Sequence, residues 1–223
     1  MNREVDMQAI SDGRLYSAND MVRADCQGCA GCHTCCTGMG SSILLDPYDI
    51  HRIRSYFRIP FEALMANHID LRVVDGMILP NLRMTGEDEH CIFLNGEGRC
   101  GIHKIRPGFC RLFPLGRIYE GRSFHYFLQT EECPHPDRQK IKVKKWIDEA
   151  DVRRYEQFVK DWHYFLKDAA AALAAEAASD ETVRNVNIYV LKQFYMRGFE
   201  DGRDFYMQFG ERLAETKAAL GMD

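Results

Sequence analysis

The sequence predicts an α+β fold, in which a small, irregular, cysteine-rich part with short hairpins is followed by a mainly α-helical extension. All nine cysteines lie before Pro134, among glycines, prolines and short apolar runs. Beyond Pro136 there is no further proline, and apolar residues recur at helical spacing. We therefore expect a cysteine-cluster domain over residues 1–137 and a helical C-terminal extension over residues 138–223.

Two short helices are predicted early in the chain. Asp46 and Pro47 supply an N-cap and a proline for the first turn, and apolar residues at helical spacing continue to Phe57. A second helix is expected near Pro60, because apolar residues from Phe61 onward again fall on one face.

Two hairpins are expected to frame the loops of the cysteine-rich part. Asp75-Gly76 separates two apolar runs, which is the signal for a tight two-residue turn. A second hairpin is predicted to turn at Glu120-Gly121, between strands over residues 115–119 and 123–129.

Three helices are predicted in the C-terminal third. One long helix should run from near Trp146 into the alanine-rich stretch 169–178, a second should be capped by Ser179-Asp180, and a third should cover residues 203–219. Aromatic residues at helical spacing mostly pack in cores, so we interpret those of this region as core rather than as a cofactor pocket.

The bulk composition excludes several classes of partner. The chain is 46% hydrophobic and 28% charged, with a net charge of -4 and a pI near 6.1. This balance lacks the broad basic surface that nonspecific nucleic-acid or acidic-membrane binding needs. No segment reads as a secretory signal or a membrane span, so we expect a cytoplasmic protein with no membrane or nucleic-acid partner. A protein partner of unknown identity stays open.

The cysteines are read as metal ligands because a reducing cytosol disfavours structural disulfides, and an odd count disfavours complete pairing. The segment Cys26-Gln-Gly-Cys29-Ala-Gly-Cys32-His-Thr-Cys35-Cys36 has five thiols in eleven residues. Gaps of two residues, with glycine in them, let the chain wrap its sulfurs around one centre.

Adjacent Cys35 and Cys36 would point to opposite sides of an extended chain, which favours two metal sites. The cysteines beyond this segment supply further thiols, and eight divides into two sets of four without using Cys26. The predicted ligands are Cys29, Cys32, Cys35, Cys36, Cys91, Cys100, Cys110 and Cys133.

The spacing favours an iron–sulfur cluster of the 4Fe–4S type over zinc. Successive two-residue gaps from Cys29 to Cys35, with a distant Cys133-Pro134, are typical of ferredoxin clusters, whereas zinc more often uses paired knuckles. Zinc stays the alternative. The nearby histidines are interpreted as neighbours of the thiolates rather than as ligands. Thiolate sites are negatively charged, so we expect charge compensation from at least two of Arg99, Lys104, Arg106, Arg111 and Arg117.

The same residues resemble a known family, the YkgJ family of zinc- or iron-chelating domains. The family's CxxCxxCC motif corresponds to Cys29–Cys36. Its second half corresponds to Cys91, the Gly98-Arg99-Cys100 turn, the run Arg106-Pro107-Gly108-Phe109-Cys110-Arg111-Leu112-Phe113-Pro114, and Cys133. The resemblance covers residues 26–136 and leaves the helical tail outside it.

Three functional hypotheses follow from these observations. The first is a metal-binding protein whose iron–sulfur clusters or zinc ions serve a structural or electron-transfer role. The second comes from the family's similarity to flagellin lysine N-methylases, which implies a protein-lysine methylase dependent on S-adenosylmethionine. The sequence has no strand followed by a Gly-x-Gly-x-x-Gly turn and helix that would hold this cofactor. Catalytic residues are not assigned, and metal storage or delivery is a third hypothesis.

Overall fold

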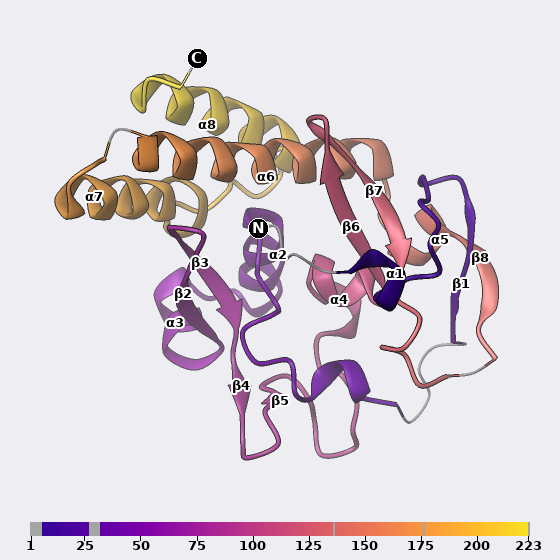
Figure 1. The fold of residues 1–223 in the computed structure, drawn as a ribbon. Helices are drawn as coiled ribbons and strands as arrows, with labels where there is room; N and C mark the ends of the chain where they lie inside the picture. Colours follow the sequence, from indigo (N-terminus) through magenta and orange to yellow (C-terminus); the bar gives the residue numbers. More distant parts are fainter. Residues whose placement is uncertain (1–5, 27–31, 136, 176, 223) are drawn as a thin grey trace. The chain divides into compact units, whose positions relative to one another are not determined.

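The computed structural model describes residues 6–26, 32–135, 137–175 and 177–222. Helices and short antiparallel strands alternate through these residues, which confirms the predicted α+β fold (Figure 1). The helical segments are α1 (Met7–Ile10), η1 (Thr34–Cys36), α2 (Pro47–Phe57), α3 (Phe61–Asn67), η2 (His103–Ile105), α4 (Gly108–Leu112), α5 (Val143–Ile147), α6 (Val152–Ala175), α7 (Asp180–Leu191), the π-helix η3 (Lys192–Met196) and α8 (Phe205–Ala219).

The strands of the described residues pair into four two-stranded antiparallel sheets, β1–β8, β2–β3, β4–β5 and β6–β7. No larger sheet joins them in this part of the chain. Their bounds are β1 (Met21–Asp25), β2 (Ile69–Val74), β3 (Met77–Leu82), β4 (Met84–Thr85), β5 (His90–Cys91), β6 (Leu115–Glu120), β7 (Ser123–Leu128) and β8 (Gln139–Lys142).

Backbone contacts divide the chain into two compact units. The helical unit comprises Leu44–Leu82 and Arg154–Asp223, and the cysteine unit comprises Asn2–Ile43 and Arg83–Arg153. These units do not follow the expected boundary at residue 137, because α2, α3 and the β2–β3 hairpin group with the C-terminal helices. The extent of the separately folding domains stays a prediction.

Local signals shape the first part of the helical unit as predicted. The Asp46 carboxylate caps α2 by accepting a hydrogen bond from the Asp49 amide at 2.8 Å, and the Asp49 carboxylate accepts one from the Asp46 amide at 3.3 Å, forming a capping box. The β2–β3 hairpin turns at Asp75-Gly76, whose φ angles of 49° and 82° lie in the left-handed region that the short turn requires.

Aromatic side chains fill the core of the helical unit. Phe158 and Trp162 of α6 meet rings from the last two helical segments, with centroids 4.7 Å apart for Phe158–Phe209 and 4.9 Å apart for Trp162–Phe194. The ring of Tyr48 in α2 packs on the Phe205 ring, with the two centroids 4.8 Å apart. Most of these rings are buried, so the interpretation of the aromatic stripe as core is confirmed.

Two arginines bind the carbonyl groups where η3 ends. Arg54 of α2 donates to the Tyr195 carbonyl at 3.1 Å, and Arg212 of α8 donates to the Gln193 and Arg197 carbonyls at 3.0 and 2.7 Å. The Arg212 guanidinium also lies 3.9 Å from the centroid of the Phe199 ring. Cationic side chains at a helix C-terminus donate hydrogen bonds to its unpaired carbonyls and interact favourably with its dipole. Arg54 and Arg212 therefore stabilise the end of η3.

The C-terminal helices differ from prediction at one point. The long helix expected from Trp146 is interrupted, since α5 ends at Ile147, the next residue Asp148 has a left-handed φ of 54°, and α6 begins at Val152. Trp146 Nε1 donates to the Leu112 and Phe113 carbonyls at 3.2 and 3.1 Å, which ties α5 to α4 in the cysteine unit.

The second predicted hairpin is present in the cysteine unit, with its turn one residue later than expected. Glu120 pairs with Ser123, so the turn residues are Gly121 and Arg122, with φ angles of 56° and 61°. In this unit Tyr16 and Tyr126 exchange backbone hydrogen bonds of 2.8 and 2.9 Å, which join the N-terminal segment to β7. Among the described residues, no helix has the length and apolar character needed to cross a membrane.

Candidate metal centre

The first cysteine segment is only partly described, because Cys29 lies outside the described residues. Cys35 and Cys36 lie in the short helical turn η1, which closes with a hydrogen bond of 2.7 Å from the Cys36 amide to the His33 carbonyl. The Cys32 sulfur lies 3.5 Å from the Thr34 hydroxyl. These thiols are half-buried and are not in disulfides.

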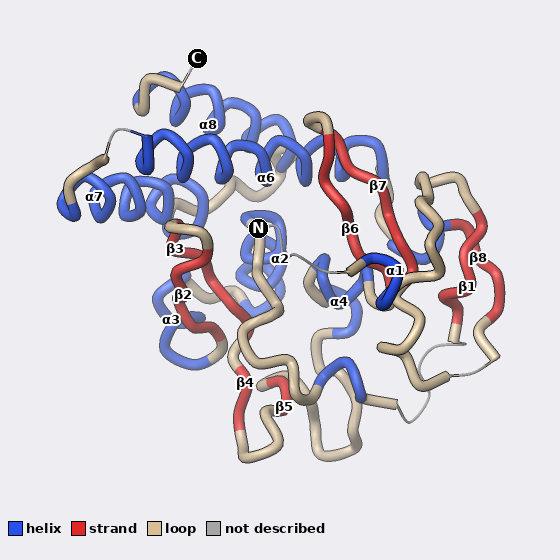
Figure 2. The backbone as a smooth tube through the Cα atoms, in the orientation of Figure 1, coloured by secondary structure: helices blue, strands red, loops and turns tan. Residues whose placement is uncertain are grey.

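The second group of cysteines is placed by the β4–β5 pair and the turn after it. Cys91 ends β5 opposite Met84 and is buried. The Asn95 side chain accepts hydrogen bonds from the Glu97 and Arg99 amides at 3.1 and 2.8 Å, which builds the turn that brings Cys100 back beside Leu94. The segments that carry the described cysteines are mostly loop, with short helical turns and two-residue strands (Figure 2).

Backbone and side-chain contacts join the two cysteine segments. The Gly38 amide donates to the Glu89 carbonyl at 3.1 Å, just before Cys91. The His33 ring packs against Gly98 so closely that a Cβ at Gly98 would lie 3.2 Å from its Nδ1, and Gly98 has a left-handed φ of 69°. The Gly98 turn therefore requires glycine both for its conformation and for this approach.

The thiols of Cys35, Cys91 and Cys100 are brought into one electrostatic environment. A hydrogen bond with Cys36 is the main cause that raises the pKa of Cys35, followed by burial. Burial is the main cause that raises the pKa of Cys91 and of Cys100, and negative charge on Cys35 raises both further. Thiols from three chain segments therefore interact within the cysteine unit.

Arg106 supplies the positive charge expected near these thiols. Its guanidinium lowers the pKa of both Cys35 and Cys100, opposing the effect of burial. Arg111, in contrast, is buried in an ion pair with Glu149, which packs α4 against the end of α5. Arg117 lies over the Phe124 ring at 5.4 Å. Charge compensation is thus supported for Arg106, while Arg111 and Arg117 have structural contacts.

Cys110 and Cys133 occupy the remaining predicted positions. Cys110 lies in α4, whose next residue, Arg111, forms the buried ion pair with Glu149. Cys133 follows β7 in the connection to β8. Both thiols are half-buried and outside disulfides, as is Cys26. Sequence patterns did not identify Glu149, because its partner lies in another element and no local motif connects them.

The histidines near the cysteines have mostly protein partners. His90 interacts through Nδ1 with Asp88 at 2.7 Å and through Nε2 with Thr85 at 3.1 Å. His103 Nε2 lies 3.2 Å from the Arg106 guanidinium, and burial is the main cause that lowers its pKa. His135 differs, since its Nε2 is buried without a hydrogen-bond partner among the described residues. A buried, unpartnered imidazole nitrogen beside Cys133 is a candidate neighbour or ligand for a metal.

The donor set fits a metal that prefers sulfur. In the described part of the chain, no three histidine, cysteine or carboxylate side chains are already arranged to hold a metal ion. The available donors are nevertheless thiols in partly buried surroundings, with one arginine beside them. Thiolates of this kind bind zinc or the irons of a sulfur cluster, whereas calcium and magnesium prefer oxygen.

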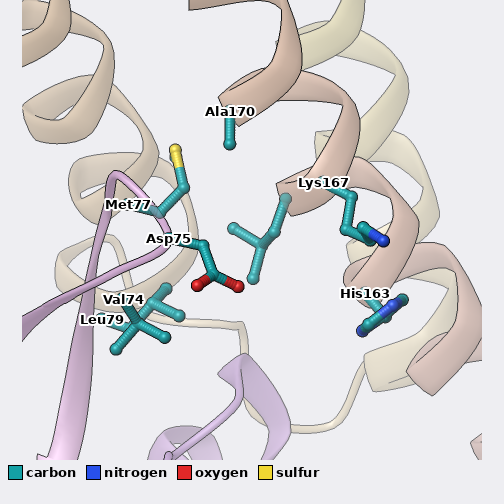
Figure 3. A pocket seen from close by; sticks show the side chains of 8 residues that line it. Val74, Asp75, Met77, Leu79, His163, Lys167 and Ala170 are labelled. Atoms are coloured by element: carbon teal, nitrogen blue, oxygen red, sulfur yellow. The ribbon is translucent and has the colours of Figure 1, made fainter. Parts of the chain in front are cut away.

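A cavity of about 80 Å³ lies in the helical unit, and the residues that line it do not include those of the candidate metal centre. It is lined by the β2–β3 hairpin and α6, and Figure 3 shows the Asp75 carboxylate, His163 and Lys167 around its apolar wall. No cysteine lines it. The cavity therefore offers no thiolate to a metal.

The segment that carries these thiols matches a family of cysteine-rich metal-chelating domains. Residues 26–134 match the family model CxxCxxCC, described as "Putative zinc- or iron-chelating domain". This segment belongs to that family, the YkgJ-type family, which confirms the resemblance drawn from the cysteine motifs. The family indicates a zinc- or iron-chelating function.

The chain is also similar to the uncharacterized protein MJ0661 of Methanocaldococcus jannaschii, with 28% identity over 115 residues. The match covers 48% of this chain and 58% of MJ0661, so it spans less than two thirds of that relative. No solved structure matches this chain.

Proposed function

We propose that this protein holds iron–sulfur clusters, or alternatively zinc, through the eight predicted cysteines, in a structural or electron-transfer role in the cytoplasm. The observation that supports the proposal best is the influence of Cys35 on the pKa of Cys91 and of Cys100, two thiols of another segment of the same unit. Neighbouring thiolates are costly to ionise together, and a bound cation would remove that cost.

The proposed role follows from the local architecture. Around the cysteines the chain forms two-residue strands and short helical turns, in which buried apolar side chains such as Phe93 and Ile102 are scattered. A metal bound by four thiolates would connect these segments in place of a larger core. An iron–sulfur cluster would in addition accept and release an electron. In either case Arg106 would offset part of the negative charge of the thiolates.

The spacing of the cysteines in the first motif favours an iron–sulfur cluster over zinc. The two-residue gaps among Cys29, Cys32 and Cys35, and the distant Cys133-Pro134, follow the ferredoxin pattern. Protein purified without air should therefore absorb in the visible range and contain iron and sulfide in equal amounts. Colourless protein that carries zinc would assign the alternative metal.

Cysteine variants test the ligand set. We expect Cys36→Ser and Cys110→Ser to lose metal and to lower the free energy of unfolding of the cysteine unit, because each would leave a coordination position empty. Cys26→Ser is the matched control, since Cys26 is outside the proposed set and should be replaceable. Metal analysis and thermal unfolding under anaerobic conditions measure both effects. Full metal content in both ligand variants would contradict the proposal.

The methylase alternative suggested by the family resemblance has its own readout. Calorimetry of the metal-loaded protein with S-adenosylmethionine would detect the cofactor binding on which this activity depends. We expect no binding heat, because the proposed role needs only the metal. Saturable binding would favour the enzyme instead.

A further inference from the structure

The strands β1 and β8 form a two-stranded ribbon with one buried and one exposed face (Figure 1). In their register Val22 lies opposite Ile141, and Arg23 lies opposite Lys140. Opposite residues of an antiparallel pair share a face, and successive residues alternate between the two faces. Val22 is buried, whereas Arg23 and Lys140 are exposed. The ribbon therefore buries one face in the cysteine unit and presents the other to solvent.

The exposed face of this ribbon carries positive charge. Met21 lies opposite Lys142, so these two residues share the face of Arg23 and Lys140, and all four are exposed. Asp25, the last residue of β1, lies beyond a bulge in the register. The regular part of the ladder therefore forms a face with three cations and no carboxylate, and we call Met21, Arg23, Lys140 and Lys142 the basic face.

The backbone that carries this charge is held in place. After β8 the chain continues into α5 with two more lysines, Lys144 and Lys145, of which Lys145 is exposed. The Val143 amide donates to the Asp20 carbonyl at 3.0 Å, and the Lys144 amide donates to the Ala18 carbonyl at 2.9 Å. Charges on a fixed backbone cost less ordering on binding than charges on a loose segment.

These cations have no compensating carboxylate among the described residues. Elsewhere the chain pairs exposed arginines with its own acids, as in the contact of Arg203 with Glu211 at 3.1 Å. No ion pair of this kind in the described part of the chain involves Arg23, Lys140 or Lys142. Like charges directly opposite in a sheet are destabilising, and Arg23 and Lys140 are such a pair. The ribbon therefore keeps a repulsion that a partner of negative charge would relieve.

The chemistry of the basic face favours an acidic protein segment over nucleic acid. Proteins that bind single strands combine cations with aromatic side chains on which bases stack, and the basic face has no aromatic residue. The net charge of the chain is -4, which opposes the binding of a long polyanion. In an extended acidic segment, carboxylates at alternate positions recur about every 7 Å, which is also the interval between residues 140 and 142 of β8.

We propose that the basic face binds an acidic segment of a partner protein. The carboxylates of that segment would lie against Arg23, Lys140 and Lys142 and would replace the repulsion between the first two by ion pairs. Exposed ion pairs are individually weak and are screened by salt. The complex is therefore transient and forms best at low ionic strength.

A synthetic acidic peptide tests this binding. Fluorescence anisotropy with a labelled short peptide of alternating glutamate and serine should show binding to the full chain at low salt and release as salt is added. The same peptide with glutamine in place of glutamate should not bind. The triple variant Arg23→Gln, Lys140→Gln, Lys142→Gln should weaken binding roughly tenfold, because three exposed ion pairs contribute a few-fold each.

The matched control removes the same charge from the helical unit. Lys167→Gln, Arg184→Gln and Lys192→Gln, combined in one chain, replace one exposed arginine and two exposed lysines and should leave the affinity unchanged. Circular dichroism verifies that both triple variants are folded.

A single variant gives a second readout that does not depend on the peptide. Lys140→Gln removes the repulsion with Arg23, so the Tm of the full chain should rise while its affinity for the peptide falls a few-fold. A lower Tm would mean that Lys140 stabilises the fold, and it would contradict a cation retained for binding.

Three binding results would overturn the inference. The first is no binding of the glutamate peptide at low salt, and the second is an equal loss of affinity in the two triple variants. The third is tighter binding of a labelled single-stranded oligonucleotide than of the peptide, which would assign nucleic acid to this face. The mutated residues lie outside the proposed metal ligands, so failure of the metal proposal and failure of this one are distinguishable.

Discussion

At the scale of single residues, His51 is a base held among aromatic rings of the helical unit. Its ring stacks on Phe205 at 5.4 Å and meets Phe199 at 5.7 Å. Burial is the main cause that lowers its pKa below the ordinary value of 6.5. The charged groups that also act on it are Asp201, which raises the pKa, and Arg52, Arg54 and Arg212, which lower it.

This histidine should make the protein sensitive to mild acid. Because the unfolded state binds the proton more tightly, the free energy of unfolding should fall as the pH drops from above 6.5 towards the lowered pKa. His51→Phe keeps a ring in place and should reduce this fall. Urea unfolding at pH values on both sides of 6.5 measures the difference. His125→Gln, on the exposed part of β7, is the control, and equal slopes for His51→Phe and the natural chain would contradict the prediction.

At the scale of elements, one amide side chain fixes the β2–β3 hairpin on α7. Asn187 is buried, accepts from the Ile78 amide, and donates to the Gly76 and Val183 carbonyls at 3.1 and 2.9 Å. Asn187→Leu would leave the Ile78 amide and the Gly76 carbonyl without this partner, which should lower the free energy of unfolding by about 1–3 kcal/mol. Denaturant unfolding would measure it.

The matched control for Asn187→Leu is Asn185→Leu, two residues away on the exposed side of α7. It should change the free energy of unfolding little. Hydrogen exchange at the Ile78 amide adds a local readout and should accelerate only in Asn187→Leu. Equal destabilisation by both variants would contradict the assigned role.

Sequence reasoning succeeded for elements whose causes are local. The Asp75-Gly76 hairpin and the Asp46 cap were predictable because the turn and cap residues themselves determine the backbone. The break at Asp148 was not, since neither glycine nor proline marks it. The contact of Asn187 with the hairpin was missed because its hairpin partners, Ile78 and Gly76, lie more than a hundred residues away in sequence.

For the metal centre, spacing identified candidate thiols but could not say which would meet. Cys35 influences Cys91 and Cys100 although they are distant in sequence, and the Gly38–Glu89 hydrogen bond joins their segments. The complete ligand set stays a prediction, and Cys29 lies outside the described residues.

At the scale of the whole molecule, the two units have different means of stabilisation. The helical unit has an extended aromatic core, whereas the cysteine unit combines a buried core that includes Leu115 and Tyr126 with thiol-rich loops. If metal holds the loops, removing it with a chelator should unfold them selectively. Hydrogen exchange should then accelerate over residues 83–112 while α6 and α8 keep their protection. Loss of protection everywhere at once would contradict this view.

The interleaved path of the chain sets an order of events during synthesis. The cysteine unit begins with Asn2–Ile43, is interrupted by Leu44–Leu82, and resumes at Arg83. Since a polypeptide leaves the ribosome from its N-terminus, Cys32, Cys35 and Cys36 emerge long before Cys133. The first cysteines are therefore present in the growing chain before the other proposed ligands have been made. Under the proposed ligand set, the complete centre cannot form before Cys133 has been made, so an oxidant that acts earlier meets thiols that lack this centre.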